Sequence, residues 1–375
     1  MGKTPDRHSP KFWNEGTEPW ISIADLTKCN KYIENTAEKI TATAVDESGI
    51  KIIPKNTVIM SFKLSIGKVA ITPKEMCSNE AIMSFIDKGV LKIEPVYLYY
   101  LLMHKDWDTG TNKAVMGKTL NKATLSQMTV NIHGYSEQLE IIKALDAASS
   151  IIAARKQQLT ELDNLVKARF VELFGDPVSN PKDWNVEPLG KRCGIITGNT
   201  PPRSEPENYG KYIEWIKSDN INTPFTFITK AQECLSEAGF EKCRFVEAGS
   251  ILMTCIAGSI DCIGNVAVTD RRVAFNQQIN AIVPEQDEVL YLYWLMQLSK
   301  PMIHRTINMA LKGILSKSQL SEIVFPFPPI TLQEQFVAFV EQTDKSKVVE
   351  AIYKANTLFI TLNGGNRYDI RANEF

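Results

Sequence analysis

The sequence predicts an α+β protein in which two similar mixed α/β domains are each followed by a long helix, the two helices pairing as an antiparallel coiled-coil spacer. Three observations support this prediction. The sequence repeats itself at a nearly constant offset, each copy mixes short β-type runs with a short helix, and each copy ends in an apolar stripe of helical period. The composition, with 44% hydrophobic and 23% charged residues, is typical of a globular chain and excludes disorder.

An internal repeat defines the two copies. Residues 2–10 and 198–206 agree at five of nine positions, with an offset of 196. Further matched positions are Trp20 with Trp215, Gly67 with Gly264, Asn79 with Asn276, Tyr97 with Tyr291, Gly117 with Gly313, Leu125 with Leu320, and Glu137-Gln138 with Glu334-Gln335. Because the offset stays between 194 and 197 over about 140 residues, we interpret the repeat as a duplication.

Each copy has the same order of elements. Gly and Pro bound β-type runs at 57–62 and 250–255, as is typical of strands and turns. Short helices are expected at about 95–107 and 287–300, and last strands at 128–132 and 323–327. These elements place the first domain at 1–135 and the second at 175–330.

Long helices are predicted after both domains. Residues 136–174 contain no Pro or Gly, and their apolar residues lie three, four or seven positions apart, which puts them on one helical stripe. At ~1.5 Å per residue this helix is roughly 58 Å long. Gly175 and Pro177 end it, and a similar stripe predicts the second helix at 331–362, followed by an irregular tail at 363–375.

The two copies differ at their start. The second copy has Trp184, Leu189-Gly190 and the β-like run 193–197 before Gly198, whereas only Met1 precedes Gly2. We therefore expect the first domain to lack its N-terminal strand.

Charge and cysteine usage exclude several classes of protein. With 42 Lys+Arg against 43 Asp+Glu the net charge is −1, which excludes a uniformly basic coat but leaves room for a local basic cleft. The seven cysteines form no C-x-x-C pair, so neither a disulfide framework nor a zinc site is indicated and a reducing cytoplasm is expected. No apolar run reaches the ~18 residues of a membrane span.

The sequence contains no convincing catalytic motif. The sequence has no P-loop and no glycine-rich cofactor loop, and its four histidines are scattered. Residues 199–202, Asn-Thr-Pro-Pro, only superficially resemble an adenine methyltransferase motif and belong to the duplicated turn. We therefore expect no catalytic residue and no metal site.

The order domain, helix, domain, helix resembles the specificity (S) subunit of type I restriction-modification systems, the HsdS family. The most specific matches are 165–177 at the end of the first long helix, Trp184 with Leu189-Gly190, and the strand-to-helix junction 327–335. The resemblance covers about residues 1–350, and it implies that the two domains are target-recognition domains.

The resemblance implies a non-catalytic subunit that binds double-stranded DNA, reads a bipartite target, and directs adenine methylation and ATP-dependent cleavage by other chains. Its implied partners are two methyltransferase (M) subunits and restriction/translocase (R) subunits, which would hold S-adenosylmethionine, ATP and Mg²⁺. Alternatives are a coiled-coil scaffold with two protein-interaction modules, an inactive truncated allele, or a self-sufficient methyltransferase or nuclease. DNA binding with steep salt dependence separates the first reading from the scaffold.

Candidate DNA contacts are polar side chains in the matched loops, because Lys, Arg, Asn, Gln and Ser read base edges and phosphates. They are Arg7, Lys63, Ser65, Lys68, Lys118 and Lys122 in the first copy and Arg203, Ser259, Asn265, Arg271, Arg272, Gln277, Lys312 and Lys317 in the second. The interpretation of each Lys as a solvated charge, and of Arg7 and Arg203 as structural ion pairs, remains open. Candidate partner contacts are Lys156, Gln157, Glu161 and Lys167 on the first long helix.

Two segments differ most between the copies, about 27–50 and 222–248. Since the surrounding scaffold matches, we expect sequence preference to lie there, with each domain reading a different half-site.

Overall fold

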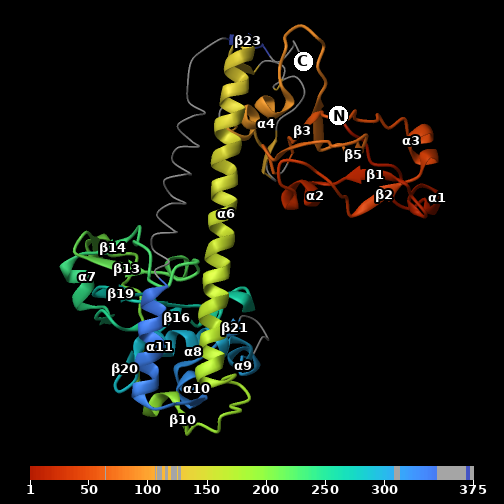
Figure 1. Ribbon diagram of the computed structural model, residues 1–375. Helices are drawn as coiled ribbons and strands as arrows, with labels where there is room; N and C mark the ends of the chain where they lie inside the picture. Colours follow the sequence, from red (N-terminus) through yellow and green to blue (C-terminus); the bar gives the residue numbers. More distant parts are fainter. Residues whose placement is uncertain are drawn as a thin grey trace. The chain divides into compact units, whose positions relative to one another are not determined.

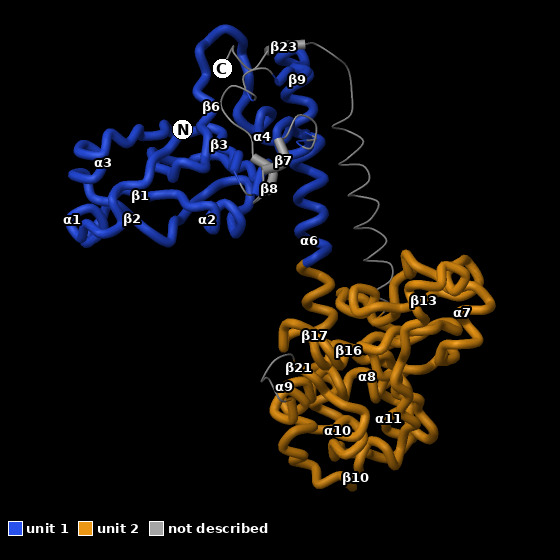
Figure 2. The backbone as a smooth tube through the Cα atoms, turned by 180° about the vertical axis from the view of Figure 1, so that it is seen from behind, with its two compact units in different colours: residues 1–156, 349–375 blue, residues 157–348 orange. Residues whose placement is uncertain are grey.

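The fold is described from a computed structural model, which describes residues 1–63, 65–105, 107, 112–114, 117–119, 125, 128–307, 313–343 and 369–371. The chain divides into two compact units, unit 1 with residues 1–156 and 349–375 and unit 2 with residues 157–348 (Figure 2). Helix α6 (Tyr135–Phe174) contributes its first part to unit 1 and the rest to unit 2. No helix among the described residues is long and apolar enough to cross a membrane.

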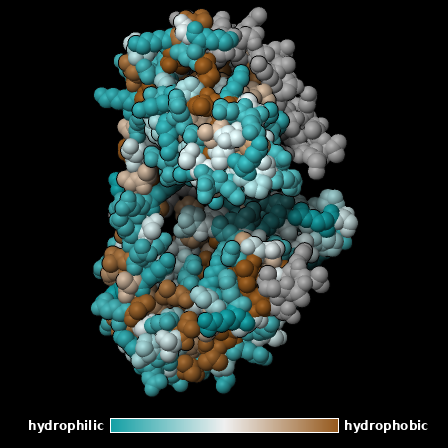
Figure 3. Space-filling model, turned by 90° about the vertical axis from the view of Figure 1, so that its right-hand side faces the viewer, coloured by the Kyte–Doolittle hydropathy of each residue, from teal (hydrophilic) through white to brown (hydrophobic). Residues whose placement is uncertain are grey.

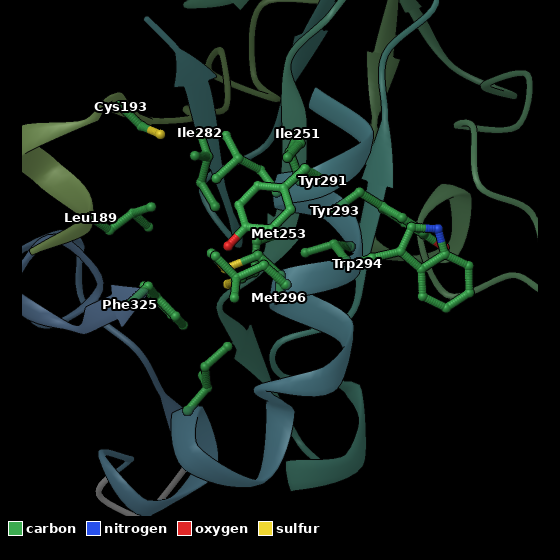
Figure 4. Close-up of a cluster of buried hydrophobic side chains, with 14 of the residues drawn as sticks. Leu189, Cys193, Ile251, Met253, Ile282, Tyr291, Tyr293, Trp294, Met296 and Phe325 are labelled. Atoms are coloured by element: carbon green, nitrogen blue, oxygen red, sulfur yellow. The ribbon is translucent and has the colours of Figure 1, made fainter. Parts of the chain in front are cut away.

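Unit 2 is built on an antiparallel four-stranded sheet in the order β11-β20-β16-β18 (Figure 1). The bounds are β11 Cys193–Thr197, β16 Ile251–Thr254, β18 Val266–Val268 and β20 Ile279–Pro284. Helix α8 (Val289–Leu298) packs against this sheet, and Figure 4 shows its Tyr291 and Met296 beside Ile251, Met253 and Ile282 of the strands. Burial of both strand faces explains why the run at 251–253 is continuously apolar.

A second layer of strands in unit 2 has the order β12-β14-β13-β19-β15, with β13 and β19 parallel. Its bounds are β12 Tyr209–Gly210, β13 Ile213–Ile216, β14 Cys234–Leu235, β15 Phe245–Val246 and β19 Val273–Phe275. The remaining elements are β10 Val186–Pro188, η1 Leu189–Lys191, η2 Pro206–Asn208, η3 Ser218–Asn220, α7 Glu237–Glu241, β17 Ile256–Ala257, η4 Ile260–Cys262, α9 Lys300–Arg305, β21 Gly313–Ile314, α10 Lys317–Glu322 and β22 Val324–Pro326.

Unit 1 repeats this plan with fewer strands. Its sheets are β4-β3-β6 and β2-β1-β5, and β1 and β5 are parallel as β13 and β19 are. The elements are α1 Pro10–Trp13, β1 Glu18–Ile21, α2 Ile23–Lys28, β2 Glu38–Ile40, α3 Ala42–Ser48, β3 Val58–Ser61, β4 Val69–Ile71, β5 Cys77–Ser78, β6 Ile82–Phe85, α4 Pro95–His104, β7 Asn112–Ala114, β8 Gly117–Thr119 and β9 Thr129–Asn131. The α+β class and the two similar units are confirmed.

The C-terminal tail contains a strand where the sequence predicts irregular chain. Strand β23 (Asp369–Arg371) pairs antiparallel with β9, and β10 pairs in the same way with β22, the counterpart of β9. The register agrees, since Asn131 faces Asp369 and Pro326 faces Val186. The tail therefore supplies to unit 1 the strand that β10 supplies to unit 2. The described residues show no unit 1 counterpart of β11, so β6 is an edge strand of its sheet.

The two long helices pack antiparallel where both are described. Helix α11 (Ile330–Gln342) places Phe336 at 5.3 Å from the ring of Phe170 and 5.5 Å from that of Phe174, and Arg169 lies over Phe339. A later residue of α11 thus contacts an earlier residue of α6, so the two helices run antiparallel, as predicted. Residues 344–362 of the predicted second helix lie outside the described residues.

The contacts of the helix starts correct one alignment made from sequence. The buried amide of Gln138 accepts from the backbone N–H of Glu94, and the buried amide of Gln333 accepts from that of Glu288. Gln138 is therefore the counterpart of Gln333 and not of Gln335. Identity alone had matched the wrong pair because both Gln333 and Gln335 follow the strand-to-helix junction.

Candidate nucleic-acid interface

Three segments meet at the same place in each unit. We call them the glycine turn (2–5 and 198–201), the asparagine turn (79–81 and 276–278) and the hairpin loop (62–68 and 255–265). The asparagine turn follows the parallel strand β5 or β19, and the hairpin loop follows β3 or β16. The sequence candidates Lys63, Ser65, Lys68, Ser259, Asn265 and Gln277 all belong to these segments.

Matched backbone hydrogen bonds connect the glycine turn to the residue that follows the asparagine turn, and the hairpin loop to the asparagine turn itself. Gly2 N–H donates to the carbonyl of Ile82 at 3.2 Å, and Gly198 N–H to that of Ile279 at 3.0 Å. Phe62 N–H donates to the carbonyl of Ala81 at 3.0 Å, and Cys255 N–H to that of Gln278 at 2.7 Å. The duplicated residues thus assemble the same loop cluster twice.

The repeated glycine is required because the two turns approach closely. A Cβ atom on Gly2 would lie 2.1 Å from the carbonyl oxygen of Ser78, and one on Gly198 would lie 2.2 Å from that of Asn276. No side chain can be accommodated at such distances without a backbone shift. This explains why glycine opens both copies of the matched nonapeptide.

Arg7 and Arg203 lie at equivalent positions between two aromatic rings and a carboxylate. The guanidinium of Arg7 is 4.0 Å from the ring of Trp13 and 4.7 Å from that of Trp20, and it pairs with Glu38. Arg203 is 4.7 Å from Tyr209 and 5.2 Å from Trp215, and it pairs with Glu233 at 3.0 Å. This arrangement favours a structural ion pair, one of the two interpretations that the sequence left open for each arginine. The side chains of both arginines and both glutamates are partly exposed.

Arg271 and Arg272 are also held by carboxylates. Arg271 forms a two-pronged pair with Glu214, at 2.7 and 2.9 Å, and contacts Asp270. The guanidinium of Arg271 holds the pKa of Glu214 below its usual value. Arg272 donates to Glu247 at 2.7 Å. Base reading by this pair stays a prediction, and it requires these side chains to exchange partners.

The hairpin-loop candidates are tied to the segments that differ between the copies. Lys68 Nζ donates to Thr27 Oγ1 at 2.8 Å, and Asn265 Nδ2 donates to Asn222 Oδ1 at 2.8 Å. Thr27 and Asn222 begin the segments 27–50 and 222–248, so equivalent contacts link loop and variable segment in both units. Sequence reasoning missed Thr27 and Asn222 as partners, and their offset of 195 was the available signal.

The remaining candidates are placed as follows. Lys63 extends over the ring of Phe62, Ser65 is partly exposed, Ser259 caps η4 and Lys317 is exposed at the start of α10. Lys118 lies in β8, but the structure does not describe its side chain. Lys122 and Lys312 lie outside the described residues. The partner candidates Lys156, Gln157, Glu161 and Lys167 are all exposed on α6.

The three buried cysteines have raised pKa values. Burial raises the pKa of Cys193 and of Cys255 to about 12 and that of Cys77 to about 11, so these thiols are protonated at neutral pH. The described residues contain no group of His, Cys, Asp or Glu that could hold a metal ion.

The face drawn in Figure 3 is mainly hydrophilic with scattered apolar patches.

Comparison with known proteins places this architecture. The chain is 28% identical over 223 residues to the MjaIX specificity subunit of Methanocaldococcus jannaschii, a type I restriction enzyme subunit, covering 54% of this chain and 51% of that subunit. It is 30% identical over 184 residues to the HindI specificity subunit of Haemophilus influenzae, covering 47% of this chain and 38% of that subunit. The matches thus span about half or less of these relatives.

The fold has a solved counterpart. The crystal structure of the type I restriction-modification S subunit from M. genitalium superposes with a TM-score of 0.53 at 14% identity, covering 96% of this chain and 92% of that one. The family described as "Type I restriction modification DNA specificity domain" matches residues 1–164 and 181–354, which is most of the chain and both of its repeats. The chain therefore belongs to the type I restriction-modification DNA specificity family.

Proposed function

We propose that each unit reads one half of a bipartite double-stranded DNA target. The observation that carries this proposal is the duplicated loop cluster, in which exposed polar side chains sit on a rigid frame of matched backbone bonds. A frame that is constant while its side chains differ is suited to reading two different half-sites, because the position is fixed and the pattern of donors and acceptors varies.

We further propose that the exposed residues of α6 contact methyltransferase subunits, two per chain, and that restriction subunits join this complex. Methylation of adenine and ATP-dependent cleavage would then belong to those partners, with their S-adenosylmethionine, ATP and Mg²⁺. The exposed Lys156, Gln157, Glu161 and Lys167 support a polar protein contact. A cytoplasmic location is part of this proposal.

Co-expression with the methyltransferase subunit of the same system tests the proposal. Methylated adenines mapped across the genome should define one two-part sequence with a fixed gap, and purification of the complex should give two methyltransferase subunits per chain. Random methylation, or none with a folded complex, would contradict DNA reading by this chain. A stable one-to-one complex at saturating methyltransferase would contradict the stoichiometry.

A protein scaffold is the competing interpretation. Binding of the full chain to duplex DNA should weaken steeply as salt rises if phosphates are contacted, since each neutralised phosphate releases counterions. A scaffold would show no such dependence. No observation on the described residues favours the scaffold over DNA reading.

A further inference from the structure

The middle residue of the asparagine turn has a different hydrogen-bonding character in the two units. Glu80 and Gln277 occupy this position, each exposed between the glycine turn and the hairpin loop. The sequence predicts Gln277, but not Glu80, as a candidate DNA contact. Both side chains lie just after a parallel strand, β5 or β19, in the turn whose backbone also accepts an N–H from the hairpin loop.

A threonine of the glycine turn fixes each of these side chains. Thr4 Oγ1 donates to Glu80 Oε2, and Thr200 Oγ1 donates to Gln277 Oε1. The turn itself is closed in both units by its asparagine, whose side-chain oxygen accepts a backbone N–H at 3.0 Å, from Ala81 in one case and Gln278 in the other. A held side chain has less conformational entropy to lose on binding.

The threonine leaves bonding capacity on both residues. A carboxylate accepts about four hydrogen bonds, so Glu80 keeps acceptor positions and offers no donor. Gln277 keeps both hydrogens of Nε2, which no described residue accepts, and a second lone pair on Oε1. By contrast, Arg7, Arg203, Arg271 and Arg272 are each occupied by a carboxylate.

We propose that Glu80 and Gln277 are the equivalent base-reading residues of the two units, Glu80 selecting cytosine and Gln277 selecting adenine. This inference rests on the proposed function, and it identifies two residues that perform the base reading. An acceptor-only carboxylate matches the N4 amino group of cytosine, whereas an amide matches the N6 and N7 atoms of adenine in two bonds. The positive charges of Lys63 and Arg7 act on Glu80 and offset its repulsion from phosphate.

Selection of bound sequences from a randomised duplex by the full chain tests the inference. Glu80→Gln should move the preference at one position of one half-site from cytosine toward adenine, by about 5- to 100-fold in relative enrichment. Gln277→Glu should make the reverse change in the other half-site. Glu75→Gln, which removes an exposed carboxylate from the same unit, should leave both half-sites unchanged.

Thr4→Val provides a second test, since it removes the bond that fixes Glu80 but keeps the carboxylate. It should flatten the preference at the same position and leave the other positions as they were. A purely structural threonine would lower affinity for all sequences equally. Unfolding curves of all variants, matched to that of the wild type, ensure that folded chains are compared.

The outcomes separate this inference from the function on which it rests. If the wild type enriches a bipartite sequence and neither exchange alters a single position, Glu80 and Gln277 do not read bases although the chain does. If the wild type enriches no sequence, both the inference and the proposed DNA reading are overturned. A change in the same half-site from both exchanges would overturn the equivalence of the two units.

Discussion

In both units, a buried glutamine amide at the start of the long helix forms hydrogen bonds to the preceding domain. The partners of this amide differ between the two units. In unit 1, Gln138 Nε2 donates to the carbonyls of Lys92 and His133, at 3.2 and 3.0 Å. In unit 2, Gln333 Nε2 donates to the carbonyl of Pro328 at 2.9 Å and to the carboxylate of Asp287 at 2.8 Å. A backbone carbonyl in one unit is thus replaced by a buried charge in the other.

The buried charge brings a further element into unit 2. Asp287 is fully buried on its side chain and pairs with Arg192, at 3.0 and 2.8 Å, from the chain between η1 and β11. Unit 1 has no described counterpart of β11 and no such pair. The comparison teaches that the amide is the common part of the junction. The ion pair secures a segment of unit 2 that has no counterpart among the described residues of unit 1.

Exchange of a variable segment should produce the largest difference between the two units, because it should alter the DNA half-site of one unit only. Replacing residues 222–248 with the same segment of another family member should change one half of the DNA target, apart from the position assigned to Gln277, and leave the other half unchanged. Exchange of residues 27–50 should do the reverse. Mapping methylated adenines in cells that carry each hybrid measures both outcomes.

The contact between Asn222 and Asn265 sharpens that experiment. An exchange that starts at residue 223 keeps this bond, whereas one that starts at residue 222 breaks it unless the incoming residue can accept from Asn265. We expect the first hybrid to bind more tightly. If either exchange altered both half-sites, the two units would not read DNA independently.

Removal of the buried carboxylate should have the next largest effect, and only in unit 2. Asp287→Ala removes the carboxylate that pairs with Arg192 and one of the two acceptors of Gln333 Nε2, and we expect a loss of about 3 kcal/mol in the free energy of unfolding. Urea unfolding with hydrogen exchange of α8 measures the loss and locates it. The matched change Lys92→Ala in unit 1 should cost less than about 1 kcal/mol, because Gln138 uses only the backbone there. Similar losses in both units would contradict the comparison.

The sequence predicted the architecture because its signals are local or periodic. The repeat is recognised from identities at a fixed offset, and the helical stripe and the end of α6 at Gly175, with φ of 79°, depend on neighbouring residues. The equivalence of Gln138 and Gln333, the pairing of β23 with β9, and the partners of Arg271 depend on contacts between distant residues. For the same reason Glu80 was overlooked, since its role follows from Thr4 and not from its own surroundings in the chain.

The glycine turn should respond equally in both units. Gly2→Ala and Gly198→Ala each force a Cβ into a backbone carbonyl, and we expect each to cost about 2 kcal/mol in the stability of its own unit. Gly258→Ala is the control, because no atom lies within 4 Å of its added Cβ. Thermal unfolding and hydrogen exchange of each unit check these values. Unequal losses would show that the turn has different functions in the two units.

The ion pair of Arg271 is the smallest of these differences, and it has no counterpart in unit 1, where Pro19 and Lys74 occupy the corresponding positions. Arg271→Ala should lower the free energy of unfolding at pH 7 by about 1 kcal/mol, between the values for exposed and buried pairs. Because Arg271 lowers the pKa of Glu214, this contribution is complete above the usual glutamate pKa and is lost as the pH falls through the lowered value. The difference between wild type and variant should therefore begin to shrink near the usual glutamate pKa of about 4 and disappear once the pH is below the lowered pKa of Glu214. If instead Arg271→Ala leaves stability unchanged but alters the preferred bases, Arg271 leaves Glu214 to read DNA, as the sequence had suggested.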